Sequence, residues 1–175
     1  MTDNHSYAVN VPSTMSKSDF VDVFGGVYEH TPWIAEHVWS DRLTSEHDTA
    51  TGLHTAMAAI VDASEKQARL DLLCAHPDLA GKLAVRRELT AESTDEQAGA
   101  GLDQCSDEEF AQFQVLNERY KAKFGFPFIL AVRGRGRVEI LEAFRQRVDH
   151  DVETEFAEAL NQVHQIALLR LHQID

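Results

Sequence analysis

Apolar residues recur along this chain with the period of an α-helix. Leu53, Met57 and Ile60 or Val61 form one such stripe, and Phe156, Leu160 and Val163 belong to another near the end of the chain. No segment shows the two-residue alternation of a strand, and runs rich in Val, Ile and Thr are absent. The pattern predicts an all-α fold, a single-domain helical bundle of about eight helices with no sheet.

Start and stop signals divide this pattern into elements. A serine followed three residues later by glutamate, the spelling of a capping box, occurs at Ser93 and at Ser106. Residues 1–15 are polar and are expected to be a flexible segment, while 16–175 form one domain. The expected helices are 19–24 capped by Ser16 or Ser18, one from Pro32, 45–63, one capped by Ser64, a short one opened by Ser93, 107–124, 138–148 and 152–172.

Three short stretches interrupt the helical pattern at polar or proline-bearing points. They are HPDLAGK at 76–82, STDEQ at 93–97 and KFGFPFI at 123–129. A proline disfavours helix in the residue before it, so His76-Pro77 ends a helix and leaves the imidazole at a turn. These interruptions predict a small active site with one histidine, one carboxylate and one exposed backbone segment.

His76 is the candidate proton carrier, because histidine exchanges protons near neutral pH. The structural alternative is a histidine that interacts with the last carbonyl groups of its helix. Glu96 has a similar pair of interpretations. It could orient the His76 ring or share its proton, and it could also be the N3 residue of a capping box begun by Ser93, since the two interpretations are compatible. Gln97 adds an amide that can both donate and accept a hydrogen bond.

The Phe126-Pro127-Phe128 segment also has two interpretations. It could be a buried apolar connector, with Phe128–Val132 extended after the proline. Alternatively, its N–H and C=O groups could stay unpaired and bind the polar edge of a flat heterocycle, with the two phenyl rings sandwiching that heterocycle. The spacing of the residues does not decide between these interpretations.

Charge and composition exclude several classes of partner. The 175 residues include 29 acidic and 16 basic ones, for a net charge of −13, which would repel nucleic acid and an anionic membrane surface. No apolar run is long enough to span a bilayer, and the first residues lack the features of a signal peptide. Two cysteines do not form a disulfide framework, and Cys74 is expected to be buried. A cytoplasmic location is the simplest expectation.

The sequence shows neither a metal-binding nor a nucleotide-binding motif. The nine histidines show no HExxH or Cys-pair spacing, so no metal site is expected. The glycines of the arginine–glycine segment 133–137 do not resemble a nucleotide-binding fingerprint, because no strand–turn–helix pattern surrounds them. The segment is expected to be an exposed turn, in which one arginine could steer an anionic substrate.

In their order along the chain, these motifs resemble the family of 2-oxo-4-hydroxy-4-carboxy-5-ureidoimidazoline (OHCU) decarboxylases. The resemblance runs through HPDLAGK, STDEQ and NERYK at 117–121, which leads into KFGFPFI, and through ILEAFRQRV and IALLRL near the end. It covers about residues 16–172. One departure is His150, where many family members carry asparagine.

The resemblance implies an all-helical homodimer that binds a small anionic ureidoimidazoline and needs no cofactor. It implies that His76 and Glu96 are the catalytic residues. The implied substrate-binding residues are Pro77, Ser93, Thr94, Asp95, Glu96, Gln97, Phe128, Ile129, Leu130, Ala131 and Val132.

The implied reaction is the decarboxylation of OHCU to (S)-allantoin, the last step from urate to allantoin in purine catabolism. Two alternatives stay open. An acidic helical adaptor that binds a helix of another protein in an apolar groove would have the same composition. A sister enzyme could act on a related ureido acid. The adaptor does not account for the ordered motifs.

Overall fold

The computed structural model describes residues 4–81 and 89–175. These residues form eight α-helices and three short 3₁₀ helices, and they contain no strand beyond an isolated bridge between Ser6 and Thr49. The all-α prediction is confirmed. Contacts group the chain into two compact units, one of Met1–Ala75 with His164–Asp175 and the other of His76–Val163. In the described ranges, no helix is long and apolar enough to cross a membrane.

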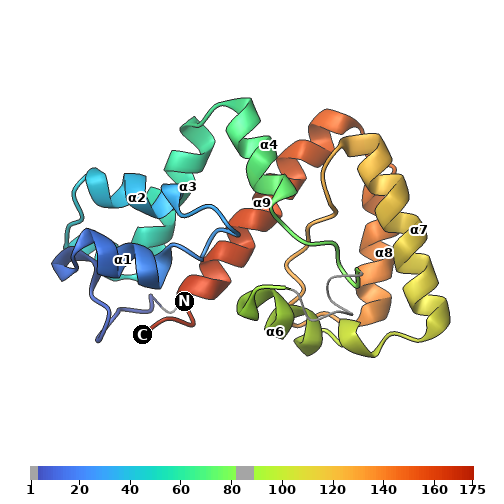
Figure 1. Ribbon diagram of the computed structural model, residues 1–175, viewed down its shortest axis with the longest axis horizontal. Helices are drawn as coiled ribbons and strands as arrows, with labels where there is room; N and C mark the ends of the chain where they lie inside the picture. Colours follow the sequence, from blue (N-terminus) through green and yellow to red (C-terminus); the bar gives the residue numbers. More distant parts are fainter. Residues whose placement is uncertain (1–3, 82–88) are drawn as a thin grey trace. The chain divides into compact units, whose positions relative to one another are not determined.

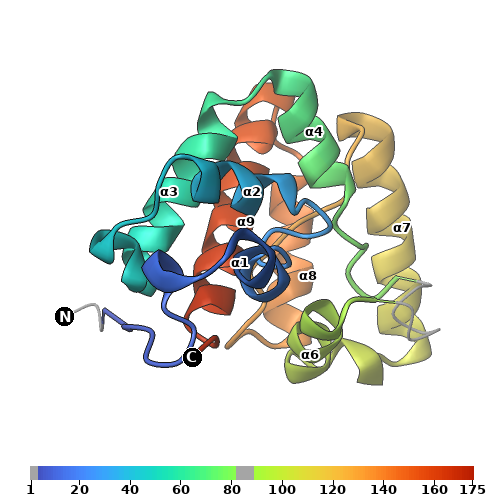
Figure 2. The ribbon, with the colours of Figure 1, turned by 60° about the vertical axis from the view of Figure 1, so that its left-hand side comes forward.

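The first unit contains four helices and the last turns of a fifth. These helices are α1 (Lys17–Phe24), α2 (Trp33–Ser40), α3 (Ala50–Ala63), α4 (Lys66–Cys74) and, from residue 164, the end of α9 (Val152–Leu171). Figures 1 and 2 show α1, α2 and α3 grouped around the end of α9.

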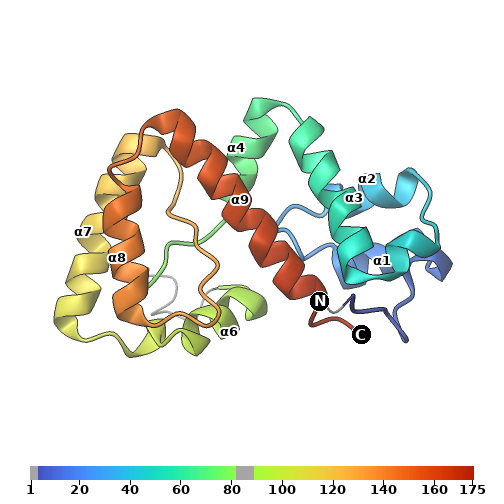
Figure 3. The same ribbon diagram turned by 180° about the vertical axis from the view of Figure 1, so that it is seen from behind.

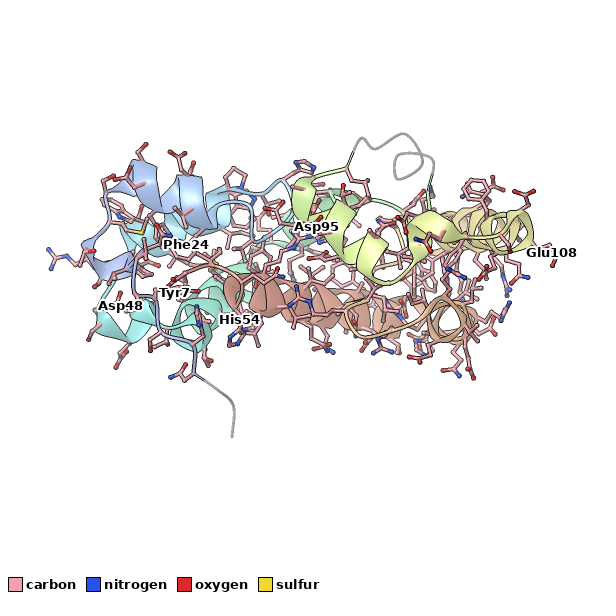
Figure 4. All side chains as sticks on the ribbon, turned by 90° about the horizontal axis from the view of Figure 1, so that it is seen from below. Tyr7, Phe24, Asp48, His54, Asp95 and Glu108 are labelled. Atoms are coloured by element: carbon pink, nitrogen blue, oxygen red, sulfur yellow. The ribbon has the colours of Figure 1, made fainter. Side chains whose placement is uncertain are left out.

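The core of the first unit joins the start of the chain to its end. Tyr7 is buried, packs edge-to-face on Phe24 at 5.2 Å between ring centroids and donates a hydrogen bond to the Leu171 carbonyl (Figure 4). Arg170 forms a buried ion pair with Glu29 at 2.7 Å. Residues 4–15 therefore contact the rest of their unit. Whether residues 1–15 move in solution stays a prediction.

The second unit contains α6 (Ala91–Gly99), a 3₁₀ turn (Leu102–Gln104), α7 (Asp107–Phe124), α8 (Arg137–Arg147) and the first part of α9. Figures 1 and 3 show α7 and α8 side by side, joined by a connector of residues 125–136 that runs back along them. Gly125 has φ +79°, a left-handed conformation that suits glycine, and it ends α7.

Most of the expected helix boundaries are confirmed. Ser16 caps α1 by accepting a hydrogen bond from the Asp19 N–H, and Ser106 forms the predicted capping box with Glu109. The stripe Leu53, Met57 and Val61 is fully buried in α3. Because caps and periodic stripes are local features, the sequence is sufficient to place these elements.

Three local predictions are wrong. Residues Ser45–Asp48 form a separate 3₁₀ helix, and α3 begins only after its cap Thr49. The start of α4 is flanked by Glu65 rather than capped by Ser64. Cys74 is exposed, because the buried residues of α4 are Leu72 and Leu73.

Candidate active site

The loop from His76 to Gly81 lies at the start of the second unit. His76 is only 8% exposed, and Leu79 and Ala80 are buried beside it in the sequence. The loop is neither helix nor strand, so its backbone groups need partners from elsewhere. Those partners come from two helices of the same unit.

Gln97 of α6 binds the loop with both ends of its amide group. Its Oε1 accepts a hydrogen bond from the Ala80 N–H at 3.1 Å, and its Nε2 donates to the Asp78 carbonyl at 3.3 Å. Gln97 is 4% exposed, so these bonds are shielded from water. The His-Pro loop and the Ser-x-x-Glu-Gln motif are therefore brought together in space.

One face of α7 binds the same loop. The Gln114 amide donates to the Ala80 carbonyl at 3.1 Å, and the Asn117 amide donates to the Leu79 carbonyl at 3.0 Å. Lys121 forms an ion pair with Asp78 at 2.6 Å. The spacings of three and four residues put these side chains on one side of the helix. The loop is held by α6 and α7 together.

The loop backbone has a conformation that is uncommon outside glycine. Ala80 has φ +48°, and both its N–H and its C=O are bonded to the glutamines described above. A Cβ atom at Gly81 would lie 2.7 Å from the Asp78 Cβ, so a larger residue would displace the turn. The glycine of HPDLAG thus allows the tight turn that follows His76-Pro77.

The implied substrate-binding residues on α6 differ in how deeply they are buried. Ser93 and Gln97 are buried one turn apart, Glu96 is half-buried, and Thr94 and Asp95 are exposed. Figure 4 labels Asp95 on this helix. The helix therefore turns Ser93, Glu96 and Gln97 inward, whereas Thr94 and Asp95 face solvent.

The prediction that Ser93 opens α6 is wrong. The helix begins at Ala91, and its cap is Thr90, whose side chain accepts a hydrogen bond from the Ser93 N–H. Ser93 is therefore the third residue of the helix, and Glu96 is not the partner in a capping box. The interpretation of Glu96 as the N3 residue of a capping box begun by Ser93 is therefore wrong.

The phenyl rings of the Phe-Pro-Phe segment belong to the core. Phe128 stacks on Phe144 at 3.9 Å between centroids, and the Arg147 guanidinium lies 4.5 Å from its centroid. Phe126 is 2% exposed and packs against Tyr120. The expectation that these rings sandwich a ligand is wrong, since both are occupied by core contacts. Binding of a ligand by the backbone of the segment stays a prediction.

That backbone, Phe128–Val132, is buried and has neither helix nor strand pairing. Buried side chains hold two of its groups. Arg147 Nη1 donates to the Ile129 carbonyl at 2.5 Å, and Gln162 Oε1 accepts from the Ala131 N–H at 2.9 Å. Within residues 4–81 and 89–175, nothing hydrogen-bonds to the N–H or C=O of Leu130, a residue that is 5% exposed. Buried backbone groups without a partner are rare, so they are candidates for a ligand.

A buried network of charged residues contacts this segment through Arg147, and the sequence did not predict it. Glu155 is fully buried, forms an ion pair with Arg147 at 2.5 Å and accepts a hydrogen bond from the Tyr120 hydroxyl. Burial and the contact with Glu155 raise the pKa of the Tyr120 phenol. His150, the residue that departs from the family pattern, contacts the other Glu155 oxygen at 3.0 Å. The available signal was Arg147, a charge on the apolar stripe of Phe144 and Val148.

Several predicted features stay outside these observations. Direct contact between His76 and Glu96 stays a prediction, as do the substrate contacts of Pro77 and Ser93. Lys82 of the HPDLAGK motif lies outside the described residues. In the described part of the chain, no group of three His, Cys, Asp or Glu side chains is placed to hold a metal ion.

Comparison with known proteins gives one consistent family. The profile of the OHCU decarboxylase family matches residues 13–172. The chain is 46% identical to the 2-oxo-4-hydroxy-4-carboxy-5-ureidoimidazoline decarboxylase of Halalkalicoccus jeotgali, over 90% of this chain and 86% of that protein. It is 42% identical to the protein of the same name from Haloferax volcanii, over 95% of both.

Solved structures agree with this grouping. A crystal structure of (S)-allantoin synthase shares 37% identity and a TM-score of 0.75, over 94% of this chain and about half of that one, 52%. A crystal structure of OHCU decarboxylase in the presence of (S)-allantoin shares the fold, with a TM-score of 0.64 at 19% identity over 91% of this chain and 97% of that one. The chain belongs to the OHCU decarboxylase family.

Proposed function

We propose that this protein decarboxylates OHCU to (S)-allantoin, the last step in the conversion of urate to allantoin. The observation that carries the proposal is the junction at Gln97, which joins the loop after His76 to the helix that carries Glu96. The family membership supports it further, as does the Leu130 backbone, which has no hydrogen-bond partner among the residues that the structure describes.

The substrate carries its own electron sink. Its carboxylate is attached to a carbon that also bears a hydroxyl and adjoins a C=N bond. When the bond to CO2 breaks, its electron pair forms a C=C bond between these two carbons, and the C=N pair moves onto nitrogen. That nitrogen takes up one proton, and a second proton is added to the former C=N carbon, which bears the ureido group, while the hydroxyl loses its proton and becomes the ring carbonyl.

In this scheme His76 is the general acid or base that moves the proton to one face of the ring. Its ring is largely shielded from water, which limits protonation by solvent. Glu96 orients His76 and binds the polar edge of the substrate. The Gln97, Gln114 and Asn117 side chains hold the loop, so the imidazole has a defined position before substrate arrives.

The test replaces His76 with alanine. We expect turnover of OHCU, followed by its ultraviolet absorbance, to fall by about 10²–10⁴-fold, the usual contribution of a general acid–base group. Circular dichroism of the product reports its chirality. The matched control is His37→Ala, since His37 is exposed on α2 and is expected to keep wild-type turnover.

Three outcomes separate the candidate functions. A His76→Ala protein that melts like wild type and keeps its turnover would remove the proposed role of His76. A wild-type protein that does not accelerate OHCU loss would favour a helical adaptor. Faster turnover of another ureido acid than of OHCU would favour a sister enzyme.

We further propose a cofactor-independent homodimer in the cytoplasm. Cofactor independence follows from the substrate's own C=N sink, and the dimer follows from the family resemblance. Activity that survives dialysis against a chelator supports the first point. Light scattering at the mass of one 19.6 kDa chain would contradict the dimer, and cell fractionation tests the location.

A further inference from the structure

Two buried side chains hold successive peptide units of the Ile129–Ala131 segment. In the first unit, the Ile129 carbonyl accepts from Arg147; in the second, the Ala131 N–H donates to Gln162. The described residues contain no cis peptide bond, so the C=O and N–H of each unit point in opposite directions. The Leu130 N–H is therefore directed away from Arg147, and the Leu130 C=O away from Gln162.

Both anchors are themselves held in place. The Arg147 guanidinium is bound to Glu155 through Nε at 2.8 Å and through Nη2 at 2.5 Å, and it lies on the Phe128 ring. Gln162 donates its Nε2 to Glu158 Oε1 at 2.8 Å, which fixes which end of its amide faces Ala131. Arg147 and Gln162 are 6% exposed each. Neither anchor can turn to another partner without losing buried hydrogen bonds.

We infer that Arg147 and Gln162 are positioning residues that hold the Leu130 N–H and C=O toward the substrate, where this donor–acceptor pair binds an N–H/C=O edge of the ureide. A ureide offers an N–H beside a C=O, the complement of the N–H and C=O of one residue. The inference rests on the proposed function, because the ligand is the substrate or product of that reaction.

The decisive variant is Gln162→Met, which keeps the length of the side chain and removes the acceptor for Ala131. The Leu130 contacts are made in the bound substrate and in the transition state alike, so KM should rise more than kcat falls. We expect (S)-allantoin to bind about tenfold more weakly, with a similar rise in KM, as for the loss of one buried hydrogen bond.

A charge swap supplies the rescue. In Gln162→Glu with Glu158→Gln, the carboxylate at 162 accepts from Ala131 and from the new amide at 158, so both bonds of the wild-type arrangement are kept. We expect KM and (S)-allantoin affinity to return to within about threefold of wild type. The matched control is Gln165→Met, an exposed position on the same helix, which is expected to leave both quantities unchanged.

Nuclear magnetic resonance of the wild-type protein tests the donor directly, even if Gln162→Met does not fold. Adding (S)-allantoin should shift the Leu130 amide resonance and slow its hydrogen exchange. An unchanged Leu130 amide, or a folded Gln162→Met protein with wild-type KM and affinity, would overturn the positioning role alone. Failure of the swap to restore a folded protein's affinity would do the same. A wild-type protein that neither turns over OHCU nor binds (S)-allantoin would overturn the proposed function as well.

Discussion

His54 is a half-buried histidine whose charge is tied to the stability of the first unit. His54 lies on α3, and its Nε2 donates a hydrogen bond to the His164 carbonyl at 2.8 Å. Burial lowers the pKa of His54, and the positive charges of His164 and His172 lower it further, although the hydrogen bond to the His164 carbonyl opposes them. The folded state therefore takes up the His54 proton less readily than the unfolded chain does.

This asymmetry predicts how stability depends on pH. Below about pH 7 the unfolded chain, with an ordinary histidine pKa of about 6.5, binds more protons at His54 than the folded state. The free energy of unfolding should therefore fall as pH is lowered from 7.5 to 5.5, by at most about 1.4 kcal/mol per pH unit from this group. Urea denaturation at several pH values measures the slope.

The His54→Gln variant isolates the contribution of this ring. Its slope should be shallower than that of wild type, and His37→Gln, the same substitution at an exposed position, is the matched control. Equal slopes for wild type and His54→Gln would show that His54 titrates normally in the folded protein.

At the scale of elements, α7 acts as the support of the His76 loop. Its inward face binds three consecutive loop residues through Gln114, Asn117 and Lys121. Asn117 is 2% exposed, and its donor is bonded to the Leu79 carbonyl. The half-exposed Lys121–Asp78 pair contributes little by comparison, because water screens it.

We predict that Asn117→Leu damages catalysis through the loop. The unpaired Leu79 carbonyl should cost about 1–3 kcal/mol of stability, and the displaced loop should lower kcat about tenfold or more with a smaller change in KM. Thermal unfolding and steady-state kinetics measure the two effects. Glu118→Gln, on the exposed face of α7, is the control. A stability loss with unchanged kcat would mean that the loop position does not depend on Asn117.

Elements and site differ in how far the sequence could predict them. Ser16 and Ser106 were placed correctly as caps, because a cap depends on three or four neighbouring residues. Thr90 took the place of Ser93 as the cap of α6: both residues satisfy the local rule, and it is the Thr90 hydroxyl that accepts a hydrogen bond from the Ser93 N–H. The anchors of the Phe128–Val132 backbone could not be predicted, because Ile129 and Arg147 are 18 residues apart and Ala131 and Gln162 are 31 apart.

At the scale of the whole molecule, charge is the dominant feature. With a net charge of −13, the negative side chains repel one another and lower the stability of the folded state. Exposed ion pairs such as Arg119–Asp149 compensate little of this repulsion, because water screens them. Raising the salt concentration shortens the range of this repulsion from about 10 Å at 0.1 M to about 3 Å at 1 M.

Salt is therefore expected to stabilise the protein. The melting temperature should be higher in 1 M than in 0.1 M sodium chloride, as measured by calorimetry. A variant with four exposed glutamates changed to glutamine, at 92, 118, 139 and 142, should show a smaller salt effect. A melting temperature that falls with salt would show that attractive surface pairs outweigh the net repulsion.

The sequence by itself determined the helical class, most helix ends, the family and the three motifs, because periodicity, caps and proline breaks act over a few residues. Only the tertiary structure decided which groups of those motifs are available for chemistry. In that structure the Phe126 and Phe128 rings pack in the core, and Gln97 binds the His76 loop. Within the described residues, the Leu130 backbone has no hydrogen-bond partner. The physical reason is that a buried polar group is satisfied by whichever partner the fold brings near, and those partners lie far away in the chain.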